Sequence, residues 1–283
     1  MNQITTKDLL DAGAHFGHKT SKWHPNFKPY IITKKNGIHI IDMKKTSDSI
    51  YKIGKEIGNI VKEGGHILFV GTKKQAKDPV QQAADKCGMF YVVDRWLGGT
   101  LTNYSTIKKS IKRLLLLEKE SSPIYANLTK KEMASLQRER IKLGDLHRGL
   151  KDMKHLPSAI FFVDGVHERI AIKEAKTLGI KVFGIIDSNT DPTQIEYPIP
   201  ANDDSIKTIN LIVNYISDII IESLGGSVEV EPTLNSKEDS QEASVKSDLD
   251  ESNVSNIKKD QGNELNEVLD KSVDIVNNKE EGK

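Results

Sequence analysis

Three histidines, a tryptophan and two lysines lie within eleven residues near the start of the chain, in the stretch AHFGHKTSKWH from 14 to 24. Histidine is the commonest metal ligand and general base, so the stretch could belong to an enzyme site or a metal site. His15 and His18 have workable ligand spacing, but no HExxH pattern and no nearby cysteine accompany them. The alternative is a nucleic-acid contact, with charge, donors and an apolar plane supplied by Lys19, Lys22, Lys28, His18, His24 and Trp23.

A second stretch, DRWLGGTLTN from 94 to 103, combines a charge, an aromatic plane and short hydrogen-bonding side chains around a Gly-Gly pair. Glycine permits close backbone approach and positive φ. Such groups hold sugar–phosphate and splayed bases in folded RNA, although a tight turn around a buried tryptophan uses the same residue types. The RNA-contact candidates here are Arg95, Trp96, Gly98, Gly99, Thr102 and Asn103.

The strongest candidate for a small-ligand site is HILFVGTKKQAKD, from 66 to 78, where a strand pattern leads through Gly71 into a helical pattern. A helix N-terminus beside lysines can bind phosphate, but the chain contains neither GxGxxG nor GxxxxGK[ST]. We expect Lys73 and Lys74 to contact an RNA phosphate. The alternative is a nucleotide- or sugar-phosphate-binding enzyme on a Rossmann-like fold.

Carboxylates also follow the predicted strands. Asp94, Asp164 and Asp187 each end an apolar run, which allows acid–base or metal chemistry, although polar residues also end strands where the chain reaches water. Asp187 could join Asp203 and Asp204 in holding a divalent ion with the histidines, and the sequence leaves this open. We predict no catalytic residue, no metal site and no cofactor.

The composition limits the kind of protein and the cellular location that the chain can have. One cysteine, Cys87, excludes an intramolecular disulfide, and we expect it to pack as a small hydrophobe. No window approaches the roughly 18 apolar residues that a membrane span needs. The first residues, MNQITTKDLLDAG, resemble neither a signal peptide nor an Arg-rich transit peptide. A cytoplasmic protein without membrane contact is therefore expected.

The net charge of +1 hides an uneven distribution. Residues 226–283 carry 7 lysines against 15 acidic residues, whereas residues 1–225 carry 34 basic and 25 acidic residues. A basic body suggests a polyanionic partner, although a modest positive excess is common in soluble proteins. After Pro232 there is no aromatic residue, and the polar composition predicts a disordered acidic tail.

Short apolar runs alternate with helical patterns through the body. Strands are predicted at 66–71, 89–94, 159–164 and 181–187, and helices at 73–86, 167–178 and 203–224. Continuous apolarity suits strands covered on both faces, and the alternation implies right-handed crossovers. The predicted fold class is α/β, a Rossmann-like (flavodoxin-like) parallel sheet flanked by helices.

Residues 104–156 contain two helical patterns, and the second begins with a capping box from Thr129 to Glu132. They predict an inserted antiparallel coiled-coil hairpin with 13 basic and 6 acidic residues, whose RNA-contact candidates are Lys108, Lys109, Lys112 and Arg113. PYIITKKNGIHIID, from 29 to 42, predicts a β-hairpin around Asn-Gly. The expected organisation is an N-terminal extension at 1–43, an α/β domain at 44–103 and 157–225, the hairpin at 104–156 and the tail at 226–283.

Several stretches together resemble the bacterial ribosomal protein S2 family over residues 3–225: AGAHFGHKTSKWHPNFKPYI, HIIDMKKT, LFVGTKKQA, RWLGGTLTNYSTIKKSIKRL, AIKEAKTLGI and IIDSNTDP. The N-terminal motif matches at Gly13, His15, Phe16, Gly17, His18, Trp23, Pro25 and Lys28. The central motif matches at Arg95, Trp96, Leu97, Gly98, Gly99, Leu101, Thr102 and Asn103. The long acidic tail departs from the family pattern, and no function is transferred to it.

The resemblance implies a structural, non-enzymatic role for the chain, bound to small-subunit ribosomal RNA. It also implies a protruding coiled-coil arm and a position on the solvent side of the subunit, between head and body. The implied partners are the messenger-binding ribosomal protein S1, which the family helps recruit, and neighbouring small-subunit proteins. We accordingly expect a cytoplasmic, ribosome-bound protein that forms no homo-oligomer.

Overall fold

The structure is a computed structural model that describes residues 4–119, 125 and 128–226. The chain divides into two compact units, Met1–Glu229 and Val230–Lys283. Only the first unit contains described residues, and the predicted disorder of the acidic tail lies outside them apart from Gly226. The architecture below is therefore that of the first unit.

The centre of this unit is a five-stranded sheet. It contains β4 (Ile67–Val70), β5 (Phe90–Val92), β6 (Ala159–Val163), β7 (Lys181–Ile186) and β8 (Tyr197–Pro200). The spatial order is β5-β4-β6-β7-β8 and every neighbouring pair is parallel, which confirms the predicted α/β class. The order reverses between β4 and β6, which makes the carboxyl ends of these strands the position where open α/β sheets bind ligands.

The eighth strand was not predicted, because its sequence YPIP contains Pro198 and Pro200. Proline cannot donate to a sheet ladder and is confined to edges and strand ends. The strand lies at the edge of the sheet, so it needs a partner on one side only.

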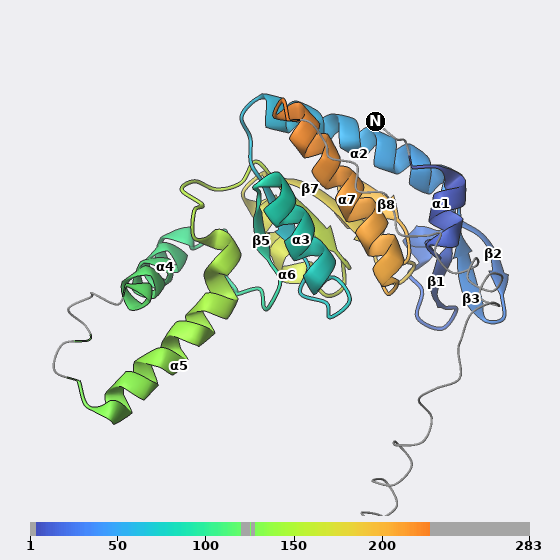
Figure 1. The fold of residues 1–283 in the computed structure, drawn as a ribbon. Coiled ribbons are helices and arrows are strands. Elements are labelled where there is room, and N and C mark those ends of the chain that lie inside the picture. Colours follow the sequence, from blue (N-terminus) through green and yellow to red (C-terminus); the bar gives the residue numbers. More distant parts are fainter. Residues whose placement is uncertain (1–3, 120–124, 126–127, 227–283) are drawn as a thin grey trace, which may run out of the picture. The chain divides into compact units, whose positions relative to one another are not determined.

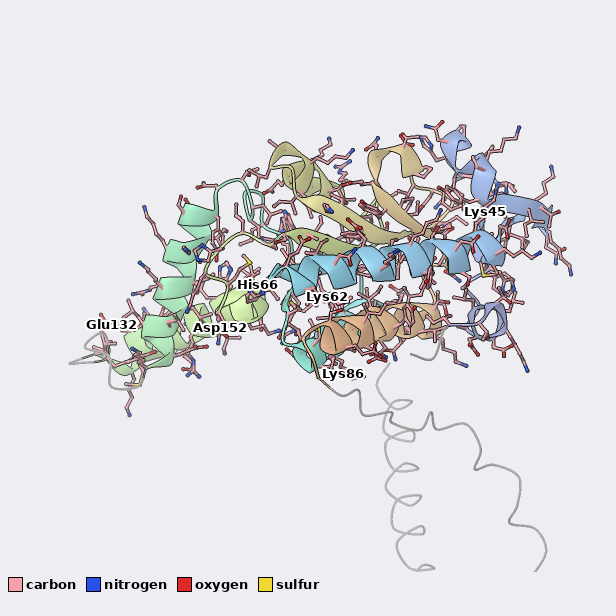
Figure 2. The ribbon with its side chains drawn as sticks, turned by 90° about the horizontal axis from the view of Figure 1, so that it is seen from above. Lys45, Lys62, His66, Lys86, Glu132 and Asp152 are labelled. Carbon is pink, nitrogen blue, oxygen red and sulfur yellow. The ribbon has the colours of Figure 1, made fainter. Side chains whose placement is uncertain are left out.

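Helices cover both faces of the sheet. Figures 1 and 2 show α2 (Met43–Lys62), α3 (Lys77–Cys87) and α7 (Ile206–Ser223) on one face, and α6 (Arg169–Thr177) on the other. The long α2 was not predicted, although its buried residues recur at helical spacing: Ile50, Ile53, Ile57, Ile60 and Val61. In the part of the chain that the structure describes, no helix has the length and apolar character needed to cross a membrane.

The core between these layers is aromatic and closely packed. Phe69, Phe161, Phe162 and Phe183 are fully buried on β4, β6 and β7. Gly184 on β7 faces this cluster, and a Cβ added there would meet the ring of Phe162. The glycine therefore provides the space that the phenylalanine ring fills.

A smaller antiparallel sheet precedes α2. It contains β1 (Phe16–Lys19), β2 (Ile31–Lys35) and β3 (Ile38–Ile41) in the order β1-β3-β2. The predicted hairpin is confirmed: Asn36 and Gly37 have φ angles of 53° and 75°, as the two central residues of a type I′ turn require. The sequence did not predict that β1, which contains His18, would pair with β3.

Two further helices lie in the 104–156 segment, α4 (Tyr104–Glu118) and α5 (Lys130–His147). The capping box at the start of α5 is confirmed. One face of α4 is buried, at Ile107, Ile111, Leu114 and Leu117. On α5, however, only His147 is buried, and Met133 and Ile141 are half-exposed. The two helices contact each other, but the apolar residues of α5 form no continuous buried seam, so a coiled coil is not confirmed.

Replacing Gly184 with alanine should destabilise the protein, because the new Cβ would overlap the Phe162 ring. We expect the free energy of unfolding to fall by about 1–3 kcal/mol in urea denaturation. Gly144→Ala is the control, since Gly144 lies inside α5 with nothing within 4 Å of an added Cβ. That variant should gain about 0.5–1 kcal/mol. Equal stability of Gly184→Ala and the wild type would contradict this packing.

Candidate nucleic-acid interface

The N-terminal histidine segment is attached to the end of β7. The backbone N–H of His18 donates to Asp187 Oδ1 at 3.2 Å and to Ser188 Oγ at 2.9 Å, and its ring Nδ1 lies 2.8 Å from Asp187 Oδ2. The hydrogen bond to Asp187 raises the pKa of His18, although burial opposes the shift. His18 was predicted to face phosphate or solvent. The structure instead places its ring half-buried against a carboxylate that is 1% exposed.

Lys73 lies at the centre of the carboxyl edge of the sheet. Its Nζ is 2.6 Å from Asp203 Oδ1, 2.7 Å from Asp204 Oδ1 and 3.3 Å from Asp164 Oδ2. Burial opposes the charge of Lys73, but these carboxylates outweigh it and raise its pKa. Burial, together with Asp164 and Asp187, raises the pKa of Asp203 to about 7, against the pull of Lys73. The charge of Lys73 is therefore compensated within the protein.

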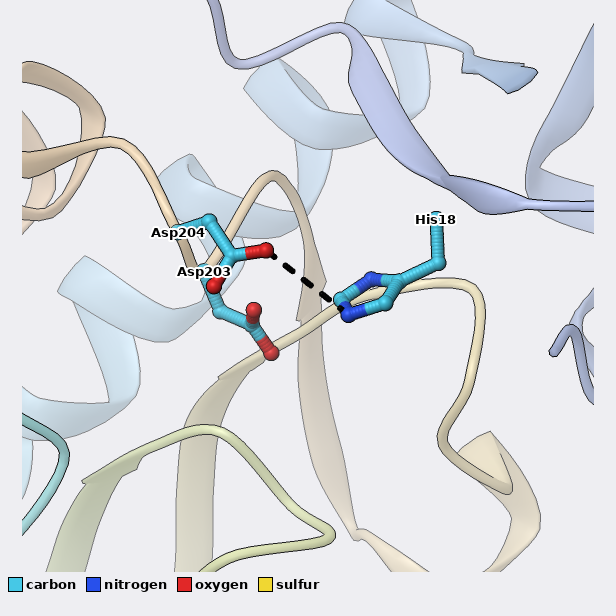
Figure 3. A group of neighbouring side chains, drawn as sticks. All are labelled: His18, Asp203 and Asp204. Atoms are coloured by element: carbon cyan, nitrogen blue, oxygen red, sulfur yellow. Dashed lines mark ion pairs between the residues drawn. The ribbon is translucent and has the colours of Figure 1, made fainter.

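Figure 3 shows the residues of this cluster that could hold a divalent cation, His18, Asp203 and Asp204. One ligand atom of each lies within 4.8 Å of the others, and the His18 Nε2 to Asp204 Oδ2 distance is 3.7 Å. Asp203 Oδ2 is buried and lacks a hydrogen-bond partner. An imidazole nitrogen with carboxylate oxygens is a donor set that metal ions accept. His15 was a further candidate ligand from the sequence, but it is not one of these three residues.

The hydrogen-bond donors of Thr72, in the turn after β4, are also paired within the protein. The backbone N–H and the hydroxyl of Thr72 donate to Glu168 Oε1, at 2.8 and 2.6 Å. Glu168 is 2% exposed, and burial raises its pKa. In a nucleotide-binding turn the corresponding N–H donates to phosphate. Here the Glu168 carboxylate accepts the Thr72 N–H in place of a phosphate, which disfavours a phosphate ligand beside Gly71.

A small cavity of about 160 Å³ adjoins this turn. Its lining residues are Thr72, Arg95, Trp96, His167, Glu168, Ile170 and Ala171. Small-molecule sites usually have volumes of about 300–1,000 Å³. The cavity is smaller, and the Glu168 carboxylate would repel a phosphate, so the geometry does not favour a nucleotide-using enzyme.

The stretch from 94 to 103, here called the glycine loop, is held by the buried carboxylate of Glu174 on α6. Its two oxygens accept from Trp96 Nε1 at 3.1 Å, Gly99 N at 2.8 Å, Leu101 N at 3.0 Å, and both the N–H and the hydroxyl of Thr102 at 3.1 Å. Burial alone would raise the pKa of Glu174, but these hydrogen bonds outweigh it and lower the pKa. Gly99 adopts a φ of 89°, a conformation that favours glycine.

This arrangement divides the predicted RNA-contact residues of the loop into two groups. Trp96 is 8% exposed and its indole N–H is used, so its plane belongs to the core. The exposed members are Arg95, Gly98, Thr102 and Asn103. An added Cβ at Gly98 meets nothing within 4 Å, so the fold itself does not require glycine there.

The other predicted lysines are mostly at the surface. Exposed side chains are found at Lys19, Lys22, Lys28, Lys74, Lys108, Lys109 and Lys112. Trp23 is only partly exposed, with its ring centroid 5.0 Å from that of His39. His24 accepts from the backbone N–H of Asn26 at 3.3 Å and caps a short 3-10 helix. Arg113 forms two hydrogen bonds with Glu139, at 3.0 and 3.1 Å, and thereby joins α4 to α5.

Sequence reasoning missed the two glutamates that organise these loops. Glu174 lies among Ala171, Ile172 and Ala175 on the buried face of α6. A carboxylate on an apolar helix face must find donors, because an unpaired buried charge is costly. The place of Glu174 on an apolar helix face was therefore the one sign in the sequence that it is paired with donors. The identity of the donors, more than 70 residues away, was not visible in the sequence.

The fold and the site define an α/β binding protein whose ligand-binding edge is filled by its own ion pairs, and whose lysines are exposed on other surfaces. A family model described as Ribosomal protein S2 matches residues 9–223. The chain belongs to the ribosomal protein S2 family, as its motifs predicted. Proteins of this family are structural ribosomal proteins, so the chain is not an enzyme.

Curated relatives agree with this assignment. Small ribosomal subunit protein uS2 of Onion yellows phytoplasma (strain OY-M) is 50% identical over 238 residues, covering 84% of this chain and 88% of the relative. The protein of the same name from Aster yellows witches'-broom phytoplasma (strain AYWB) is 49% identical with the same coverage. That of Bdellovibrio bacteriovorus is 48% identical over 243 residues, covering 85% of this chain and 76% of the relative.

Replacing Glu174 with glutamine should lower the free energy of unfolding by about 2–3 kcal/mol at neutral pH, because several donors lose a charged acceptor. The folded-state pKa of Glu174 is lowered, so its contribution is complete above the unfolded pKa of about 4.3 and is lost as the pH falls through the folded value. Denaturant melts between about pH 7 and pH 3 should show the two proteins converging in acid. Glu63→Gln, at an exposed residue, is the control. A difference in the free energy of unfolding between wild type and Glu174→Gln that stays constant across this pH range would refute the role of the Glu174 carboxylate.

Lys73→Met should leave Asp164, Asp203 and Asp204 without their cation. We expect a loss of about 3–5 kcal/mol at neutral pH, measured by urea denaturation. The loss should be larger above about pH 7 than at pH 7, because removal of Lys73 lets the pKa of Asp203 rise further, and only alkaline pH then forces this carboxyl to carry an unpaired charge. Neighbouring Lys74 is exposed, and Lys74→Met should change stability by less than about 0.5 kcal/mol. Similar behaviour of the two variants would contradict the role of Lys73.

Proposed function

We propose that the chain is a structural component of the small ribosomal subunit and binds its ribosomal RNA without catalysing a reaction. Membership of the ribosomal protein S2 family carries this proposal, since relatives about 50% identical are named as small-subunit proteins. The internal ion pairs at the carboxyl edge of the sheet support it, because they fill the position where a metabolite would bind. Binding then depends on surface charge.

The proposed contact residues are the exposed members of the predicted set, of which Thr102 also donates to Glu174 and Lys108 Nζ to the carbonyl of Lys154 at 2.7 Å. They are Lys19, Lys22 and Lys28 in the N-terminal segment, Lys74 and Arg95 at the sheet edge, and Lys108, Lys109 and Lys112 on α4, with Gly98, Thr102 and Asn103 in the glycine loop. His18, His24, Lys73, Trp96, Gly99 and Arg113 make internal contacts. These six position the contact residues. Phosphate contacts fix orientation, whereas the loop brings hydrogen-bonding groups close to sugar and bases.

The family resemblance extends the proposal to partners. It includes recruitment of ribosomal protein S1, contact with neighbouring small-subunit proteins, and a ribosome-bound, cytoplasmic location. The 104–156 segment would reach a second RNA region as an arm. Its exposed Leu115, Leu116, Met133 and Ile141 offer apolar surface in addition to charge.

The proposal predicts salt-dependent binding to small-subunit RNA. If 6–10 phosphates are contacted, affinity should fall by about a thousandfold or more between about 50 and 200 mM salt. The triple variant Lys108→Glu, Lys109→Glu, Lys112→Glu should bind at least about tenfold more weakly, because each reversal turns attraction into repulsion. Cosedimentation with subunits lacking the protein measures both effects. Reversal of the exposed α2 residues Lys52, Lys55 and Lys62 is the matched control. A flat salt response would contradict the proposal.

Arg113 needs a separate test because it pairs with Glu139. Arg113→Glu alone should weaken RNA binding by breaking the link between α4 and α5. The exchange Arg113→Glu with Glu139→Arg restores an ion pair and should restore binding in the same assay. If the exchange binds as weakly as the single variant, Arg113 contacts RNA directly.

A further inference from the structure

The lysines of the N-terminal segment include two, Lys34 and Lys35, that are not among the contact residues proposed above. Between Asp11 and Asp42 the chain contains no acidic residue, but it contains five lysines: Lys19, Lys22, Lys28, Lys34 and Lys35. All five are exposed. Among the described residues, none of them lies within 4.0 Å of a carboxylate oxygen as an ion pair. Lys34 and Lys35 are at the end of β2, next to the hairpin turn.

The strand register brings these lysines together. Lys19 on β1 and Lys35 on β2 both pair with Ile38 on the central strand β3. Directly paired residues of antiparallel strands point to the same face, so Lys19 and Lys35 lie on one face, about 10 Å apart across β3. Lys34 pairs with His39 and points to the opposite face. The hairpin end therefore carries positive charge on both faces.

The hairpin is held in a fixed conformation. The N–H of Thr20 donates to the carbonyl of Gly37 at 2.9 Å, which ties β1 to the turn. His39 is 8% exposed and packs against Trp23. A preformed surface does not lose the conformational entropy that ordering a flexible segment would require on binding.

We propose that Lys34 and Lys35, with Lys19 across β3, form a phosphate-binding surface for folded RNA of the small subunit. The inference rests on the proposed function and adds the hairpin end as a separate contact. Unpaired ammonium groups at this spacing repel one another, and a polyanion converts the repulsion into attraction. Charge on both faces fits folded RNA, which carries phosphates on several sides, better than an acidic peptide laid along one face.

The test is the double variant Lys34→Gln, Lys35→Gln in the full chain, bound to small-subunit ribosomal RNA over a range of salt concentrations. Loss of two phosphate contacts should lower the slope of log K against log salt by about 1.4–1.8, and weaken binding about tenfold or more at low salt. Lys19→Gln alone should lower the slope by about 0.7–0.9. Thermal unfolding should be unchanged in each variant, because these side chains are exposed.

Two controls separate charge from folding. Lys52→Gln with Lys55→Gln on α2 makes the same change in net charge and should leave the slope unchanged. Lys34→Arg with Lys35→Arg keeps the charge and should bind as the wild type does. If the wild-type chain does not bind the RNA at all, the proposed function fails. If the wild type binds and Lys34→Gln, Lys35→Gln matches its affinity and slope, the hairpin surface is refuted. It is equally refuted if this variant loses binding only to a polyglutamate probe, since the surface would then serve an acidic protein.

Discussion

The ammonium group of Lys73, placed among three carboxylates, is the interaction on which the carboxyl edge of the sheet depends. Asp164 follows β6, whereas Asp203 and Asp204 precede α7, and the three would repel one another without a cation between them. Asp204 also lies near His18, whose second ring nitrogen contacts Asp187 at the end of β7. One charge network thus joins the N-terminal segment to three separate connections of the sheet.

This network lies at the carboxyl edge of the sheet, where α/β sheets with this strand order usually bind ligands. The reversal between β4 and β6 creates a crevice, and open sheets of this kind bind cofactors in it. In this chain Lys73 and its carboxylates occupy the crevice, and Glu168 accepts the N–H of Thr72 that would otherwise be available to a phosphate. The sheet serves as a rigid support, in keeping with a family of structural ribosomal proteins.

Two buried glutamates, Glu168 just before α6 and Glu174 within it, hold neighbouring loops in the same way. Glu168 orders the turn after β4, and Glu174 orders the glycine loop by accepting five hydrogen bonds. Because the loop's N–H groups point inward, the exposed side chains of Arg95 and Asn103 remain for contact with a partner. Buried carboxylates therefore set the conformation of these loops. The residues that hold the loop are thus different from the exposed residues proposed to bind RNA.

Much of the fold was determined by local sequence. Continuous apolar runs gave four of the five central strands, Asn36-Gly37 gave the hairpin, and Thr129 with Glu132 gave the start of α5. The sequence also identified the family, because its motifs are distinctive. It did not show that Lys73 and Trp96 are partners of acidic residues, nor that β8 forms with two prolines. Helix and strand periods repeat every few residues and can be read locally, whereas Lys73 and Asp203 are 130 positions apart. Only the tertiary structure decides which charges meet, because burial makes an unpaired charge costly and so selects its partner.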